Sequence, residues 1–122
     1  MATKTAEKKT KKAISTVKIP SEQWSLPVSF NQEGAMVSLA DFVAEEVPAL
    51  ALSQLNLDQR AELTAKRIEL QPEMEVAMVG AGLIDKKRAI TEVKSQTPVG
   101  RNLIEIEQIF IKNLIEEAKQ NA

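Results

Sequence analysis

The sequence contains no cysteine, no histidine and no tyrosine. Without cysteine the chain has no disulfide bond, no thiolate-bound zinc and no thiol nucleophile. The absence of histidine removes the commonest general base and the commonest ligand of transition metals. Any enzymatic chemistry would therefore depend on carboxylates or lysines, and we expect neither a cofactor nor a metal.

The acidic residues do not form a pattern typical of acid–base catalysis. Glu105 and Glu107 are two positions apart, so their side chains would diverge on a helix instead of forming a close pair. Glu73 and Glu75 have the same spacing, and no EF-hand loop occurs. We predict a protein that is not an enzyme and has no small-molecule substrate. The alternative is an enzyme or metal protein that uses Glu107.

Aromatic residues make up only 3% of the 122 residues, whereas hydrophobic residues make up 43%, so the core is aliphatic. No run approaches the roughly 18 apolar residues that a membrane helix needs. The N-terminal lysines are not followed by the apolar segment of a secretory signal, and the same region lacks the arginines of a mitochondrial presequence. The sequence thus predicts a single cytoplasmic domain without membrane insertion.

The formal net charge of -1 hides an asymmetry along the chain. Residues 1–20 hold six lysines against one glutamate, a net charge of +5, and the remainder holds ten basic against sixteen acidic residues, a net charge of -6. We interpret residues 1–18 as a disordered, flexible, Lys-rich arm and residues 19–122 as one helical domain. The arm is either a solvated tail or a segment that binds phosphates.

Short β and helical patterns alternate through the middle of the chain. A turn at Asn31–Gly34 separates two apolar segments and predicts a β-hairpin over about 26–38. Ser38 and Asn56 are candidate N-caps, and Pro48 predicts a break between the first helices. Pro72 predicts a short helix that bears Met74, Ala77 and Met78 and ends at Gly80-Ala81-Gly82. Asp85 is the expected N-cap of a helix over 86–95, whose first turn is basic.

The longest patterned segment predicts a C-terminal helix over about 98–119, capped by Thr97 and opened by Pro98. Its apolar residues cover more than half of the circumference, which exceeds the arc that one side of a small domain needs. The helix is therefore either a central core helix or one that is shared with another subunit. Glu107 lies near the middle of the apolar face, so it either pairs with an Arg or serves as a functional acid.

These patterns predict a mainly α, compact helical domain of about four to five helices, preceded by a short β-hairpin or extended segment and the flexible basic arm. The expected function is a non-catalytic protein–protein interaction module, such as a small subunit, adaptor or assembly factor, that binds a protein partner or its own copy. Trp24 either clamps the core or anchors a partner. The predicted partner-binding residues are Trp24, Leu103, Ile106, Ile109, Phe110, Ile111, Leu114 and Ile115.

Nucleic-acid binding is the alternative function. It would use the lysines of the arm, the basic helix start and one arginine of the C-terminal helix. The acidic body and the apolar C-terminal helix argue against a DNA-binding helix-turn-helix. The residues of this alternative are Lys4, Lys8, Lys9, Lys11, Lys12, Lys86, Lys87, Arg88 and Arg101.

Overall fold

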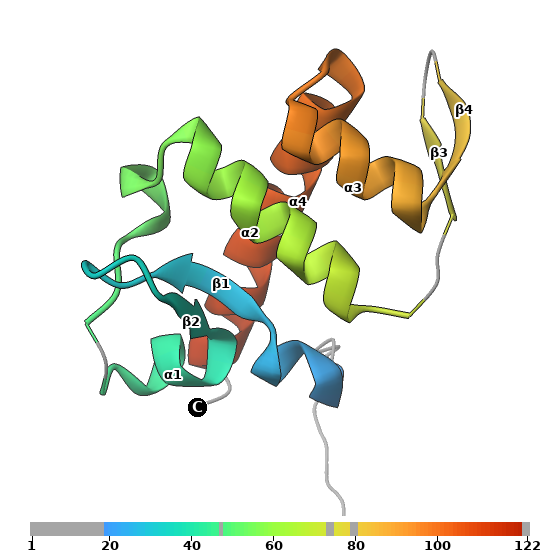
Figure 1. The fold of residues 1–122 in the computed structure, drawn as a ribbon. Coiled ribbons are helices and arrows are strands. Elements are labelled where there is room, and N and C mark those ends of the chain that lie inside the picture. The colour runs from blue at the N-terminus through green and yellow to red at the C-terminus, as the bar shows by residue number, and fades with distance from the viewer. Residues whose placement is uncertain (1–18, 47, 73–74, 79–80, 121–122) are drawn as a thin grey trace, which may run out of the picture.

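A computed structural model of the chain describes residues 19–46, 48–72, 75–78 and 81–120 (Figure 1). Within these ranges the fold is mainly α, as predicted, with four α-helices and two β-hairpins. The predicted basic arm, residues 1–18, lies outside them. The elements are η1 (Ser21–Ser25), β1 (Pro27–Phe30), β2 (Met36–Ser38), α1 (Leu39–Ala44), η2 (Leu52–Gln54), α2 (Leu57–Leu70), β3 (Glu75–Met78), β4 (Gly82–Asp85), α3 (Lys86–Ser95) and α4 (Pro98–Gln120).

Two apolar clusters form the core, and the long helices α2 and α4 contribute to both. The β1–β2 hairpin and α1 lie at one end of the molecule, α3 and the β3–β4 hairpin lie at the other, and α2 and α4 cross between them (Figure 1). The hairpin-side cluster contains Val28, Phe30, Leu39, Leu55, Leu63, Ile111, Leu114, Ile115 and Ala118. The α3-side cluster contains Ala61, Ala65, Ile68, Met78, Ile84, Ala89, Val93, Leu103 and Ile104.

The first hairpin forms where the sequence predicts it. Strands β1 and β2 are antiparallel, with Phe30 opposite Met36. The side chain of Asn31 shapes the turn, because its Oδ1 atom accepts the backbone amides of Glu33 and Ala35 at 3.0 and 2.9 Å. Gly34 has a φ of 89°, a value that glycine adopts without the steric cost of a Cβ atom.

The second hairpin replaces the short helix predicted after Pro72, and that prediction was wrong. Strands β3 and β4 are antiparallel, with Val76 opposite Ile84 and Met78 opposite Gly82. Ile84 and Met78 are buried in the α3-side cluster, so the hairpin covers that end of the core. Gly82 has a φ of 73° and is the first residue of β4, so the glycine that was interpreted as a helix stop instead begins the second strand of a hairpin.

The predicted helix starts are confirmed at four positions. Each capping side chain accepts a hydrogen bond from the backbone amide three residues later, which satisfies one otherwise unpaired donor of the first turn. Helix α1 ends at Ala44, before the predicted break at Pro48, and Glu45 adopts a left-handed conformation with a φ of 59°. The caps and their distances are Ser38 at 3.2 Å, Asn56 at 2.8 Å, Asp85 at 2.8 Å and Thr97 at 3.0 Å.

Helices α3 and α4 approach each other closely at Gly100. A Cβ atom at this position would lie 1.9 Å from the backbone oxygen of Glu92, well inside van der Waals contact. Thr97, between the two helices, donates to the same backbone oxygen at 3.4 Å. The absence of a side chain at Gly100 therefore fixes how the first half of α4 packs against α3, and hence which face of α4 points outward.

Candidate interaction surface on α4

Three large apolar side chains of α4 point away from the core. Ile106 and Ile109 are each 55% exposed and Phe110 is 42% exposed. At about 100° per residue Ile109 lies opposite the middle of the buried side of the helix, Ile106 lies next to it, and Phe110 lies at the edge that borders the buried Leu103. Single exposed apolar side chains are normal on protein surfaces, but a set of three on one rigid helix is typical of a contact surface. We call these three residues the outer face of α4.

Four of the predicted partner-binding residues instead belong to the core of the chain, and that part of the prediction is corrected. The reason is that only part of the wide apolar arc of α4 is buried. The buried residues cover about a third of the circumference of the helix and pack on α2, α3 and the first hairpin, whereas the other apolar residues face outward. The sequence pattern alone does not show where the division falls. The four buried residues are Leu103, Ile111, Leu114 and Ile115.

Trp24 lies in η1 and is half-buried. It packs against the hairpin-side cluster together with other partly buried side chains such as Ile19. This placement fits the first of the two interpretations, a clamp on the domain's own core.

Glu107 pairs with an arginine, as one of the two interpretations expected. Arg67 of α2 is fully buried, and its Nε donates to Glu107 Oε2 at 2.6 Å. The two terminal nitrogens donate to the backbone oxygen of Pro27 at 2.8 Å and to Gln23 Oε1 at 2.7 Å. The guanidinium carbon also lies 5.9 Å from the ring centre of Phe110. One buried cation thus ties α2, α4, β1 and η1 together beneath the outer face.

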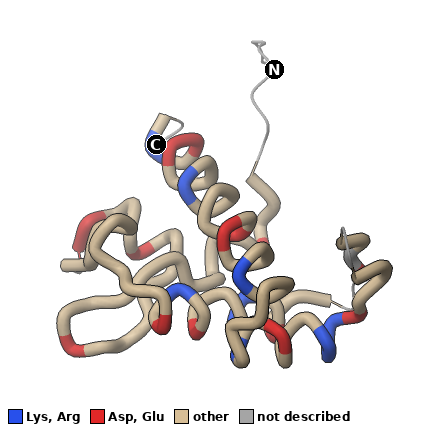
Figure 2. Tube along the Cα trace, turned by 90° about the horizontal axis from the view of Figure 1, so that it is seen from above, with Lys and Arg blue, Asp and Glu red and all other residues tan. Residues whose placement is uncertain are grey.

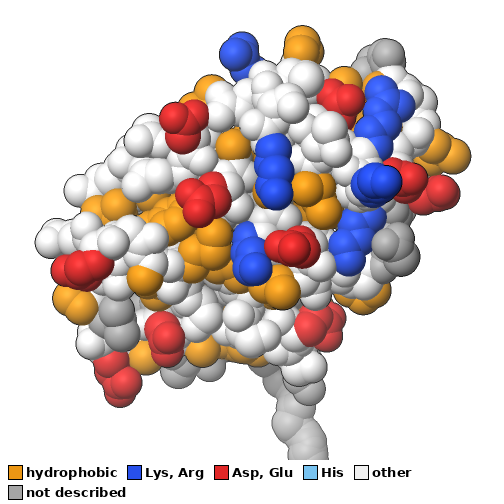
Figure 3. Space-filling model, in the orientation of Figure 1, with side chains coloured by type: hydrophobic (Ala, Val, Ile, Leu, Met, Phe, Trp, Pro, Cys, Tyr) orange, Lys and Arg blue, Asp and Glu red, His pale blue; other side chains and the backbone are white. Residues whose placement is uncertain are grey.

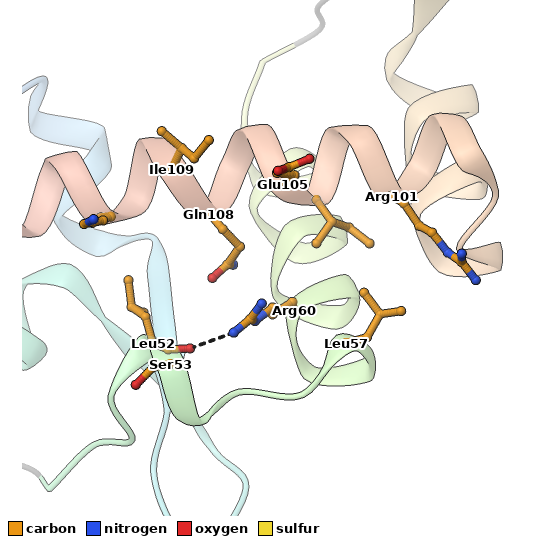
Figure 4. Close-up of a pocket in the computed structure, with 10 residues that line it drawn as sticks. Leu52, Ser53, Leu57, Arg60, Arg101, Glu105, Gln108 and Ile109 are labelled. Atoms are coloured by element: carbon orange, nitrogen blue, oxygen red, sulfur yellow. Dashed lines mark hydrogen bonds between the residues drawn. The ribbon is translucent and has the colours of Figure 1, made fainter.

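A groove of about 410 Å³ runs beside the outer face, between α4 and the segment that contains η2 and the start of α2 (Figure 4). Figure 4 shows Gln108 and Arg60 pointing into it from the two sides, with Leu52 and Leu57 along the far wall. Arg60 donates one hydrogen bond, from Nη2 to the backbone oxygen of Leu52 at 3.3 Å. The Nε atom of Arg60 and the Nε2 atom of Gln108 are buried and have no hydrogen-bond partner among the described residues.

The charges around the groove are mostly positive. Arg60, Arg101 and Lys112 line it together with one carboxylate, Glu105, which gives these four side chains a net charge of +2. Along α4 two acidic residues follow each of the basic residues Arg101 and Lys112, and the end of this helix lies beside the label C in Figure 2. Sequence reasoning missed the groove because Arg60 and Leu52 are about 50 residues from α4 in the chain and meet it only through tertiary packing.

The structure does not gather the predicted nucleic-acid residues into one site. On the face shown in Figure 3, Lys and Arg side chains concentrate on the side where α3 lies. Lys86 there donates to the backbone oxygen of Gln71 at 2.7 Å, and Arg88 lies 3.5 Å from Glu92 in an ion pair. Lys87 is exposed, and Arg101 lines the groove instead. The lysines of the arm (Lys4, Lys8, Lys9, Lys11 and Lys12) lie outside the described residues.

Comparisons with protein-family models, with curated proteins and with solved structures found no match to this chain. Among the described residues, no group of three or more Asp and Glu side chains could hold a metal ion. No helix in the same ranges is long and apolar enough to cross a membrane. The function is therefore argued from the surface of the protein itself.

Proposed function

We propose that this protein is a non-catalytic interaction module that binds a protein partner through the outer face of α4. The observation that carries this proposal is the exposure of Ile106, Ile109 and Phe110 on one side of a 23-residue helix. The other side of the helix is held by both core clusters and by the Arg67–Glu107 pair. The outer face is therefore presented on a rigid support, which lowers the entropy lost when a partner binds.

The three side chains supply part of the apolar burial that binding of a partner requires. Full burial of an Ile or Phe side chain contributes about 1.5–3 kcal/mol relative to full exposure. Because each of the three is about half exposed in the free protein, their burial by a partner would contribute roughly 2–4 kcal/mol in total. Glu105 and Lys112, two charged and exposed residues at the edge of the outer face next to the groove, suit the polar rim of an interface.

The groove supplies polar specificity next to this apolar face. A buried donor without an acceptor costs about 1–3 kcal/mol, and the groove holds two such donors, on Arg60 and Gln108. Carboxylate or carbonyl oxygens of a partner would satisfy these donors and offset the positive charge of Arg60, Arg101 and Lys112. We therefore expect the partner to present an apolar surface with acidic side chains beside it.

Site-specific photo-crosslinking tests the proposal. A photoreactive residue at position 109 is compared with one at position 70, because Leu70 is 52% exposed but lies at the end of α2. The expected result is a defined crosslinked protein from position 109 that disappears when Ile106 is replaced by Asp. The proposal fails if positions 109 and 70 give the same products, or if the Ile106→Asp change leaves the product from position 109 unchanged.

A further inference from the structure

We infer that the protein bound by the outer face is a second copy of this chain, with the two α4 helices packed antiparallel around a two-fold axis. This inference rests on the proposed function and adds the identity of the partner. Four exposed residues carry it, at successive spacings of four, three and four along α4: Asn102, Ile106, Ile109 and Asn113. At about 100° per residue they form one stripe, with the spacing of the contact positions in a two-helix coiled coil.

The order of residues in this stripe is the same in both directions. An antiparallel copy centred between residues 107 and 108 would place Ile106 opposite Ile109 of the second copy, and Ile109 opposite Ile106. The same arrangement places Asn102 opposite Asn113 of the second copy at each end, where amide side chains can hydrogen-bond. A two-fold axis requires one surface to complement itself, and this stripe meets that requirement.

The charges beside the stripe select the antiparallel orientation. Glu105 and Lys112 lie on the same edge of the outer face, next to the groove, and both are exposed. In an antiparallel pair with two-fold symmetry each edge meets its own equivalent, so Glu105 of one copy approaches Lys112 of the other, twice per dimer. A parallel pair would instead turn Glu105 toward the edge that carries Phe110.

The dimensions of the stripe set the expected strength. From Asn102 to Asn113 the helix rises about 17 Å at 1.5 Å per residue. A contact of this length with only two isoleucines at its centre falls at the small end of specific interfaces, where association is weak and reversible. We therefore expect a dimer with a dissociation constant in the micromolar range, of about 1–100 µM.

A charge exchange tests the inference. The full chain and its Glu105→Lys, Lys112→Glu and doubly exchanged variants are measured by sedimentation velocity over a concentration series, together with an equimolar mixture of the two single variants. Each single variant alone places like charges opposite each other twice, so its dissociation constant should rise by about tenfold. The mixture and the double variant restore both opposite-charge pairs, so they should dimerise like the unmodified chain. Lys94→Glu, an exposed change on α3, is the control and should have no effect.

Three results would overturn the inference. They are a monomer at every concentration, a mixture as weak as the single variants, and a Lys94→Glu effect as large as that of Lys112→Glu. The crosslinking experiment separates this failure from failure of the proposed function. If the chain is monomeric but position 109 still crosslinks a different protein in an Ile106-dependent manner, the outer face binds a protein that is not a second copy. If neither association nor crosslinking is found, both proposals fall.

Discussion

Replacing Arg67 by Ala should cause a large loss of stability. Arg67 is fully buried and makes three hydrogen bonds, to Glu107, to the backbone oxygen of Pro27 and to Gln23. Its removal leaves three acceptors without their donor, and one of them is a carboxylate that is only 18% exposed. Breaking a buried ion pair by removing one partner costs about 3–5 kcal/mol. Because a domain of this size is stable by only about 5–15 kcal/mol, the variant should lose roughly a fifth of its stability or more.

The two partners of this ion pair should not be equivalent. In Glu107→Gln the new amide oxygen still accepts from Arg67, but the buried guanidinium loses its counter-charge, so we expect a loss of about 1.5–3 kcal/mol. The exposed neighbour Lys66 is the matched control on α2, and Lys66→Ala should change the free energy of unfolding by less than about 0.5 kcal/mol. At roughly 4 °C per kcal/mol for a domain of this length, Arg67→Ala should lower the melting temperature by about 12–20 °C.

Urea unfolding followed by circular dichroism measures these differences, with the slope of the transition checked for each variant. The reasoning requires Arg67→Ala to be more destabilising than Glu107→Gln, and Glu107→Gln to be more destabilising than Lys66→Ala. If Arg67→Ala lowers the free energy of unfolding by less than about 1 kcal/mol, the idea that a buried cation joins α2, α4 and the first hairpin is refuted. Three acceptors left without a donor should cost more than that.

Three further predictions concern single positions. Gly100→Ala should destabilise the protein by about 1–3 kcal/mol or more, measured by thermal unfolding, because the added Cβ atom meets the backbone oxygen of Glu92 at 1.9 Å; an unchanged melting temperature would contradict the α3–α4 packing. Asp85→Ala should cost about 1 kcal/mol through loss of the cap on α3, whereas Asp85→Asn should cost much less. Ile109→Asp should leave the stability of the monomer within about 0.5 kcal/mol, because the side chain is already 55% exposed; a larger loss would mean that the residue is part of the core.

Local side-chain chemistry accounts for the parts of the fold that the sequence predicted correctly. The caps at Asn56, Asp85 and Thr97 depend on a side chain and an amide three residues apart, so the signal lies within one turn. The turn at Asn31–Gly34 is equally local. Helix α4 was predicted from its length and period, and the structure places it at Pro98–Gln120. Each of these features can be predicted without knowing which other parts of the chain pack against it.

The parts of the fold that the sequence did not predict depend on contacts between residues that are far apart in the chain. The second hairpin was missed because Met74, Ala77 and Met78 have helical spacing in the sequence. Met74 lies outside the described residues, and the strand state of Glu75–Met78 depends on the hairpin covering the α3-side cluster. The available sequence signal for a hairpin was the pair of glycines at positions 80 and 82, which two apolar segments flank.

For the candidate site, the sequence identified the apolar surplus of α4 but not its orientation. Ile106 and Leu103 have the same chemistry, and only the close approach at Gly100 and the Arg67–Glu107 pair decide which of them faces solvent. The groove depends on Arg60 and Leu52 meeting α4 and had no sequence signature.

The most direct test of the central claim, that the outer face of α4 binds a protein and that this protein is a second copy, is the solution mass by light scattering during dilution. The unmodified chain is compared with Ile106→Asp and with Leu70→Asp, two changes at similarly exposed positions. We predict that the unmodified chain and Leu70→Asp pass from the mass of two chains to that of one across the micromolar range, and that Ile106→Asp has the mass of one chain throughout. An Ile106→Asp variant that dimerises as the unmodified chain does would contradict the claim.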